Sequence, residues 1–195
     1  MLGISHFFAY MARMKFIRRW GIMRNTSAEN IQEHSLQTAM IAHALALIRN
    51  RLYGGQVDAQ RIMVLAVYHE AAEVITGDLP TPIKYFNETI KNAYRQIEAI
   101  ASQRLYDMIP AELQADYRSL LFVEEVDCEH RIIVKAADKV CAYMKCLEEA
   151  KAGNQEFTEA KRAIEDELDR LNLPEVDYFM KTFAPSFSLT LDELN

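Results

Sequence analysis

The sequence has few residues that interrupt helices, and it lacks a long apolar run. Its 195 residues include only six glycines and five prolines, while 50% of the residues are hydrophobic. Good helix formers such as alanine, leucine and glutamate abound, so the composition predicts an all-α fold. The length suffices for one sizeable core and predicts a single domain over residues 1–195. No uninterrupted apolar run approaches the ~18 residues of a membrane span, so we expect a soluble protein with no membrane partner.

Cysteine is scarce as well, and the chain lacks the features of a secreted protein. Its three cysteines, Cys128, Cys141 and Cys146, are odd in number and show no Cys-x-x-Cys spacing. This pattern argues against a disulfide framework and indicates a reducing compartment. The apolar start at Ile4 lacks the preceding positive charges of a signal peptide. We therefore expect a cytoplasmic protein.

Negative charge is absent from the start of a chain that is acidic overall. The net charge of −6 disfavours general binding to a nucleic-acid polymer. No acidic residue precedes Glu29, and the segment before it carries Arg13, Lys15, Arg18, Arg19 and Arg24. Such a segment could receive an anionic small molecule, or it could be a solvated basic helix face. The sequence is compatible with both interpretations.

Several common catalytic motifs are missing. The chain has no G-x-S-x-G elbow, Walker phosphate loop or G-x-G-x-x-G loop, which removes the usual signatures of hydrolases, NTPases and dehydrogenases. The pentapeptide from His69 to Glu73 approaches the zinc-protease motif H-E-x-x-H, but a glutamate occupies its last position. The second histidine of that motif is therefore absent, and a protease is excluded.

What the chain does contain is ligand-type side chains at positions that face inward. The spacing predicts a helix over 58–72, one face of which carries Ile62, Leu65, Ala66, His69 and Glu73. His34 lies on the apolar stripe of another predicted helix. Asp138 lies next to the apolar stripe of the predicted helix over 128–151. Buried polar groups need partners, and imidazoles and carboxylates can share a divalent cation. Taken singly, His69 is more simply a hydrogen-bonded core histidine and Glu70 a solvated carboxylate.

Capping and breaker residues set the expected helix boundaries. An amphipathic helix is expected over roughly the first seventeen residues, and a capping box from Asn30 to Glu33 opens the next helix. Asp58 is expected to cap the third helix, which the loop 76–82 ends. Further helices are predicted over 88–108, 111–121, 128–151 and 156–171.

The separated His, His-acid and Asp pattern resembles the HD superfamily of metal-dependent phosphohydrolases. A closer resemblance, to the bacterial 5'-deoxynucleotidase family, rests on stretches spread along the chain. They are Ser5-His-Phe-Phe-Ala, Arg19-Trp20, Met23-Arg-Asn, Glu33-His-Ser-Leu-Gln, Glu73-Val, Gly77-Asp-Leu-Pro-Thr-Pro, Lys84-Tyr-Phe-Asn, Lys135-Ala-Ala-Asp-Lys and Asp177-Tyr-Phe-Met. The stretch from Gly77 to Pro82 and the pair Arg19-Trp20 are far more specific than the HD pattern.

The resemblance implies an all-α HD fold, a homodimer and the hydrolysis of deoxyribonucleoside 5'-monophosphates to deoxynucleoside and phosphate. It assigns one divalent metal ion, such as cobalt, manganese or another transition ion, to His34, His69, Glu70 and Asp138. It assigns catalysis to Glu73, Asp78 and Arg19. It assigns substrate contacts to Arg19, Trp20, Asp78, Leu79, Pro80, Thr81 and Asp138.

The chain departs from the superfamily at one ligand position. The superfamily pattern has His-Asp where this chain has His69-Glu70, and the added methylene displaces the carboxylate on a scale that matters for catalysis. We expect Glu70 to ligate through a different rotamer, because the other matched positions are present. The alternatives are another HD phosphohydrolase, acting on a nucleoside triphosphate or an alarmone, and a catalytically weak nucleotide-binding protein.

Overall fold

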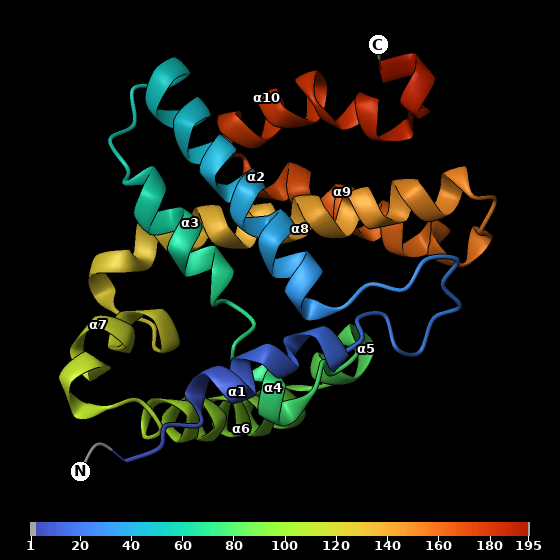
Figure 1. The fold of residues 1–195 in the computed structure, drawn as a ribbon. Helices are drawn as coiled ribbons and strands as arrows, with labels where there is room; N and C mark the ends of the chain where they lie inside the picture. Colours follow the sequence, from blue (N-terminus) through green and yellow to red (C-terminus); the bar gives the residue numbers. More distant parts are fainter. Residues whose placement is uncertain (1–2, 195) are drawn as a thin grey trace. The chain divides into compact units, whose positions relative to one another are not determined.

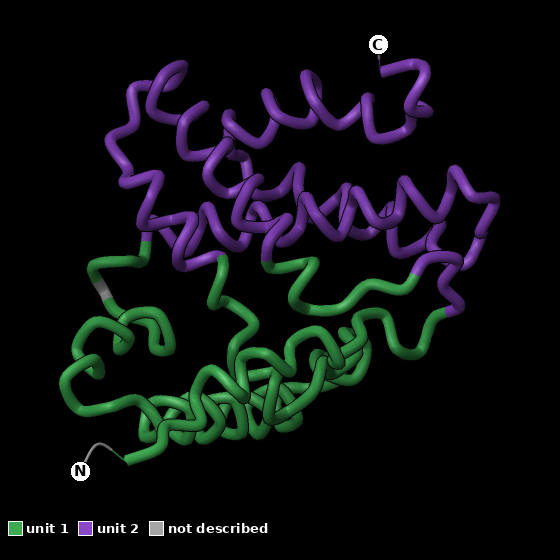
Figure 2. The backbone as a smooth tube through the Cα atoms, in the orientation of Figure 1, with its two compact units in different colours: residues 1–23, 28–35, 67–128 green, residues 24–27, 36–66, 129–195 purple. Residues whose placement is uncertain are grey.

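The computed structural model describes residues 3–194, without the side chain of Glu125. The regular secondary structure of these residues is helical. Within those residues β-pairing is limited to an isolated antiparallel bridge between Arg18 and Asn30. The all-α prediction is therefore confirmed. The chain divides into two compact units (Figure 2): unit 1 runs up to residue 23 and includes 28–35 and 67–128, while unit 2 comprises 24–27, 36–66 and residues from 129 onward. The expectation of a single domain stays a prediction.

Unit 1 is built from short helices around a small apolar core. Its elements are α1 (Phe7–Met11), η1 (Ala12–Phe16), α4 (Glu73–Thr76), α5 (Thr81–Lys84), α6 (Glu88–Tyr106), α7 (Ala111–Leu121) and η2 (Glu125–Asp127). Helices α1, α4 and α6 contact one another (Figure 1). The buried core cluster consists of Phe7, Met14, Ile31, Ala71, Val74, Leu105 and Ile109. This core anchors α4, the helix that begins with Glu73.

Unit 2 contains the longer helices. Its elements are α2 (Ile31–Leu52), whose first turn belongs to unit 1, α3 (Ala59–Val67), α8 (Cys128–Lys151), η3 (Gln155–Phe157), α9 (Thr158–Leu171), α10 (Pro174–Thr182), η4 (Ala184–Ser188) and η5 (Leu191–Leu194). Helix α9 runs beside α8 (Figure 1), joined to it by an ion pair of 2.7 Å between Lys139 Nζ and Glu167 Oε2. No helix among the described residues is long and apolar enough to cross a membrane.

The two capping predictions are confirmed. The Asn30 side chain accepts hydrogen bonds from the backbone N–H of Gln32 and Glu33, both at 3.0 Å, and Glu33 Oε2 accepts from the Asn30 N–H at 3.4 Å. This reciprocal pair is the expected capping box. Asp58 likewise accepts from two N–H groups in the first turn of α3. The predicted bounds of α7 and α8 also agree with the structure.

Other predictions of local structure were wrong. The first predicted helix is two short pieces, α1 and η1, and it ends at Phe16 because Ile17 is extended and its carbonyl accepts from the Ile31 N–H. Within the predicted loop 76–82, α5 already starts at Thr81. The C-terminal segment, for which no helix was predicted, contains α10, which has a proline at its first position, where the missing N–H costs no bond.

The third predicted helix ends earlier than expected. Helix α3 stops at Val67, and a turn joins it to α4, which starts at Glu73. Within that turn the N–H of Ala71 bonds to the carbonyl of Tyr68, and that of Glu73 bonds to the carbonyl of Glu70, both at 3.0 Å. These three-residue spacings are tighter than those of an α-helix. His69 and Glu70 therefore lie in a turn. The helical spacing from which Glu70 was expected to face solvent does not apply there.

Candidate active site

Three of the predicted metal ligands come together in unit 1. His34, His69 and Glu70 each offer one ligand atom, and these atoms lie within 4.8 Å of one another. Two imidazoles and one carboxylate form a suitable donor set for a divalent transition ion. The donor chemistry of these residues therefore fits a metal ion. Asp138, the fourth predicted ligand, is half-buried on α8 in unit 2 and stays a prediction as a ligand.

Two local structures position this group. The capping box fixes the first turn of α2, which carries the fully buried His34. The tight turn after α3 presents His69 and Glu70 as consecutive residues, with 3.3 Å between His69 Nε2 and Glu70 Oε1. The ring centroids of the two histidines lie 5.3 Å apart, and the ring planes are tilted by 49°. The ligand atoms thus come from two segments that are distant in sequence.

Glu70 also contacts the residue assigned to phosphate binding. Arg19 Nη1 donates to Glu70 Oε1 at 3.5 Å, and the Glu70 side chain is 15% exposed. Burial would raise the pKa of Glu70, but the neighbouring His69, Glu73 and Arg19 hold that pKa well below its usual range. Glu70 is therefore an ionised carboxylate, which is the form that ligates a metal.

Glu73 and Asp78 lie in the same electrostatic environment. Burial raises the pKa of Glu73, and the neighbouring charges of Glu70 and Asp78 raise it further. Of these neighbouring carboxyls, Glu73 therefore holds its proton more strongly than Glu70 does. The pKa of Asp78 is also raised, first by burial, while the charge of Arg19 opposes that shift. The two residues assigned to proton transfer thus favour their protonated forms more than ordinary carboxyls do.

A glycine turns the chain from Glu73 toward Asp78. Gly77 ends α4 with a φ of 73°, a backbone conformation that favours glycine, and its N–H bonds to the carbonyl of Glu73 at 2.8 Å. Leu79 and Pro80 follow in the half-buried loop, and the exposed Thr81 starts α5. Lys84, at the end of α5, bonds to Glu98 at 3.0 Å.

Sequence reasoning missed one residue at the centre of these contacts, Glu29. Its Oε2 accepts from Trp20 Nε1 at 2.9 Å and from Arg19 Nε at 3.3 Å, and its Oε1 lies 3.5 Å from His34 Nδ1. Burial would raise the pKa of Glu29, but the neighbouring His34 and the charge of Arg19 lower it. Glu29 lies in the loop before α2, where helical periodicity carries no signal, and it had marked only the end of the basic segment.

Trp20 adopts an unusual backbone conformation. Its φ is 58°, in the left-handed region that costs a non-glycine residue about 1–3 kcal/mol. The only other described non-glycine residue with a positive φ is Asn172, at the end of α9. The hydrogen bond from the indole to Glu29 offsets part of this strain. Such strain concentrates at functional sites, where the surrounding structure holds it.

Comparison with protein families gives a match over most of the chain. The family described as 5'-deoxynucleotidase YfbR-like matches residues 6–187. A 5'-deoxynucleotidase of Vibrio vulnificus is 54% identical over 191 residues, which cover 98% of each protein. A 5'-deoxynucleotidase of Yersinia pseudotuberculosis is 55% identical over 192 residues, again 98% of each.

Solved structures show the same fold at lower identity. An HD-domain phosphohydrolase of Listeria innocua superposes with a TM-score of 0.80 at 22% identity, covering 93% of this chain and 88% of its own. The HD phosphohydrolase DatZ of cyanophage S-2L, bound to dA and one catalytic Zn²⁺ ion, has a TM-score of 0.65 at 22% identity, with 97% and 100% covered. These likenesses establish an HD-domain fold, as predicted.

Proposed function

The chain belongs to the 5'-deoxynucleotidase YfbR-like family, and we propose that it hydrolyses deoxyribonucleoside 5'-monophosphates to deoxynucleoside and phosphate. The position of Arg19 is the observation that supports this chemistry most directly. The Arg19 guanidinium lies 3.5 Å from Glu70, one member of the His34, His69 and Glu70 group. A cation suited to phosphate oxygens therefore lies next to a donor set suited to a metal ion.

The proposed cofactor is one divalent ion held by His34, His69, Glu70 and Asp138. Cobalt, manganese or another transition ion suits imidazole and carboxylate ligands, and DatZ holds zinc. When bound, such an ion polarises a phosphoryl oxygen and makes a bound water more acidic. The HD-domain fold and the donor set support the metal, while the choice of ion belongs to the proposal.

Hydrolysis of the phosphate ester requires one group that holds the phosphate and two groups that transfer protons. Water attacks phosphorus, the bond from phosphorus to the 5'-oxygen breaks, and that oxygen takes up a proton. We assign Arg19 to holding the phosphate oxygens bidentately, a geometry that lysine cannot reproduce. Glu73 and Asp78 share the proton transfers: one accepts the proton of the attacking water, and the other donates to the leaving oxygen.

The remaining substrate contacts are assigned to Trp20, Asp78, Leu79, Pro80, Thr81 and Asp138. The indole of Trp20 would close the sugar pocket so that a 2'-hydroxyl fits poorly, which gives a preference for deoxyribose. The name of the family and the dA bound by DatZ support a deoxynucleoside ligand. We further propose a cytoplasmic homodimer, on the cysteine pattern and the family resemblance.

A second candidate function is a nucleotide-binding protein with weak catalysis. Glu70 favours it, because glutamate replaces the superfamily aspartate and its carboxylate is shared with Arg19. Full activity with any added ion would exclude this candidate.

Phosphate release tests the proposal directly. Deoxyribonucleoside and ribonucleoside 5'-monophosphates are incubated with protein stripped of metal, and single divalent ions are then added back. We expect release only after an ion is restored, with deoxyribonucleotides favoured. The absence of release with every ion would reject the enzyme, and equal rates on both sugars would reject the selectivity.

A further inference from the structure

The carboxylate of Glu29 connects three groups to which the proposed function gives different tasks. One oxygen accepts from Trp20 Nε1 and Arg19 Nε, and the other faces His34 Nδ1. We propose that Glu29 is a positioning residue that fixes the His34 tautomer, the Arg19 guanidinium and the Trp20 indole together. Only the catalytic consequences of this proposal rest on the proposed function.

The backbone holds Glu29 in place independently of its side chain. The Arg19 N–H donates to the Glu29 carbonyl at 3.0 Å, and the Ile31 N–H donates to the Ile17 carbonyl at 3.0 Å. These bonds flank the bridge between Arg18 and Asn30. The Glu29 side chain is 13% exposed, so water competes little for its oxygens. The Glu29 carboxylate therefore extends from a fixed backbone position and is largely shielded from water.

The contact with His34 selects which ring nitrogen can ligate. A carboxylate at Nδ1 keeps the proton there and leaves Nε2 as the ligand atom, the arrangement in which an outer carboxylate orients a metal-bound histidine. A glutamine at position 29 would instead turn its NH₂ group toward Nδ1. That contact favours the opposite tautomer, in which Nε2 carries the proton and cannot ligate.

The contacts with Arg19 and Trp20 fix the substrate side of the site. Arg19 is held at Nε by Glu29 and at Nη1 by Glu70, which sets the plane of its guanidinium. Trp20 pairs a left-handed backbone with an indole whose N–H is bonded to Glu29. Loss of the carboxylate thus loosens both residues while their identities remain unchanged.

Metal affinity gives the first test, because it needs no turnover. Glu29→Gln is compared with wild type by competition with a chelator for a single divalent ion, and Glu112→Gln is the matched control. Glu112 is an exposed acid of α7, outside the candidate site, and carries the same charge. We expect affinity to fall about 10–100-fold in Glu29→Gln, to recover in part in Glu29→Asp, and to remain unchanged in Glu112→Gln.

The fluorescence of the single tryptophan gives the second test. Because the chain has one tryptophan, Trp20, its emission reports this position alone. Without metal, Glu29→Ala should show red-shifted emission and stronger quenching by acrylamide, while Glu112→Ala should match wild type. Circular dichroism confirms folding, and Glu29→Gln replaces the alanine variant if that variant unfolds.

These measurements separate the positioning role from the proposed function. Wild-type metal affinity and wild-type fluorescence in the Glu29 variants would overturn the role of Glu29, even in an active phosphatase. If wild type releases no phosphate, altered affinity and fluorescence still establish the positioning role. If wild type is active, Glu29→Gln should also lose part of its preference for deoxyribose.

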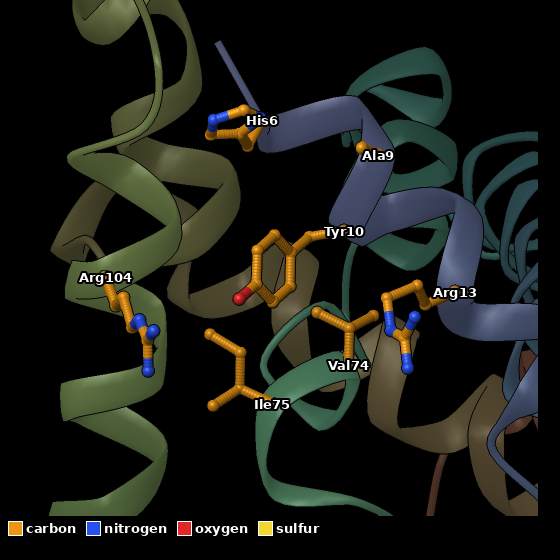
Figure 3. Close-up of a pocket in the computed structure, with 7 residues that line it drawn as sticks. All are labelled: His6, Ala9, Tyr10, Arg13, Val74, Ile75 and Arg104. Carbon is orange, nitrogen blue, oxygen red and sulfur yellow. The ribbon is translucent and has the colours of Figure 1, made fainter.

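A separate cavity in unit 1 supports a second, independent inference. It measures about 550 Å³, within the range of small-molecule sites, and is lined by His6, Ala9, Tyr10, Arg13, Val74, Ile75 and Arg104. Tyr10 projects from α1 toward α6, which carries Arg104 (Figure 3). None of these lining residues is acidic, although the protein has a net charge of −6.

The charges of this cavity point to an anionic ligand. Arg13 stacks over the Phe16 ring at 6.0 Å, and across residues 3–194 neither Arg13 nor Arg104 forms an ion pair with a carboxylate. Arg13 and Arg104 lie on either side of the Tyr10 ring (Figure 3), so each guanidinium can contact a phosphate group, and the ring offers a face to a base. We infer that the cavity binds a small phosphate-bearing anion. Such a ligand would give a role to Arg13, a member of the basic N-terminal segment that the proposed function does not use.

Arginine side-chain NMR tests this second site. Inorganic phosphate and adenosine 5'-triphosphate are titrated separately, and the Nε signals of Arg13 and Arg104 are assigned through single variants. We expect saturable shifts at both residues and little change at Arg95, an exposed arginine of α6 outside the cavity. Shifts of Tyr10 with the nucleotide alone would identify a nucleotide ligand. Shifts that do not saturate, or that equal those of Arg95, would overturn the site.

Discussion

Glu70 shares its carboxylate between two tasks. It belongs to the proposed metal ligand group and also accepts a hydrogen bond from Arg19 at 3.5 Å. Without substrate, this contact balances the charges of Glu70 and Arg19. It also occupies the guanidinium that would bind the phosphate. A glutamate at this position therefore links metal binding to phosphate binding.

Glu70→Asp tests this link. The shorter side chain should release Arg19 and provide the carboxylate of the superfamily pattern, so we expect equal or higher activity and equal or tighter metal binding. Phosphate release and chelator competition measure the two effects, and Glu112→Asp, at an exposed position of α7, is the control for the loss of one methylene outside the site. Weaker metal binding in Glu70→Asp would instead show that the site is built around glutamate.

Arg19→Lys tests the planar guanidinium. Lysine keeps the charge but cannot hold two phosphate oxygens in parallel or bond to Glu29 and Glu70 at once. We expect kcat/KM for a deoxyribonucleoside monophosphate to fall about 100-fold, close to 3 kcal/mol of transition-state stabilisation. Arg18→Lys is the matched control, because the preceding arginine is exposed. A similar loss in both variants would contradict a specific role of Arg19.

At the scale of elements, two helix caps differ in what they position. Asn30 and Asp58 each accept two backbone N–H groups at the start of α2 and α3. The first turn of α2 carries His34, while α3 ends before any proposed ligand. The same capping chemistry therefore has different consequences for the metal group.

Asn30→Ala and Asp58→Ala form a matched pair. Loss of either cap should lower the free energy of unfolding by about 1 kcal/mol. Metal affinity should fall in Asn30→Ala alone, since only that cap fixes a helix turn bearing a ligand. Urea unfolding and chelator competition measure both quantities. Equal metal affinity in the two variants would show that the cap does not position His34.

Helix boundaries were predicted well where local signals define them. The capping box at Asn30, the cap at Asp58 and the bounds of α7 and α8 follow from interactions within a few residues. The break after Val67 was missed, because hydrophobic spacing continues through it while the backbone changes to tighter hydrogen bonds. The division of the first predicted helix into α1 and η1 was missed as well, and so was the pairing of Arg18 with Asn30 just after it, which joins residues distant in sequence.

At the scale of the whole molecule, a buried carboxylate fixes a connecting segment. Residues 24–27 belong to unit 2, although the chain on either side belongs to unit 1. Glu149, on α8, accepts from Thr26 N–H at 2.9 Å, Thr26 Oγ1 at 2.7 Å and Asn154 Nδ2 at 2.7 Å, and it pairs with Lys145. Burial would raise the pKa of Glu149, but these donors hold it well below its usual range.

Glu149→Gln should therefore destabilise the protein in a pH-dependent way. A lowered pKa stabilises the folded state above the ordinary glutamate pKa, and this contribution is lost as the pH falls toward the folded-state value. We expect a loss of about 2–3 kcal/mol at neutral pH, which shrinks below about pH 4. Urea unfolding at both pH values measures it, with the exposed Glu148→Gln as control. A pH-independent difference would contradict the charge-based explanation.

The sequence by itself determined the all-α class, the main helix caps and the ligand-type residues, because these depend on composition and on interactions between near neighbours. The family resemblance added which residues to expect around them. Only the tertiary structure placed His34 beside His69 and Glu70, turned the chain sharply after α3 and revealed Glu29 between Trp20, Arg19 and His34. Those relations depend on hydrogen bonds and charges between segments distant in sequence, to which helical periodicity is insensitive.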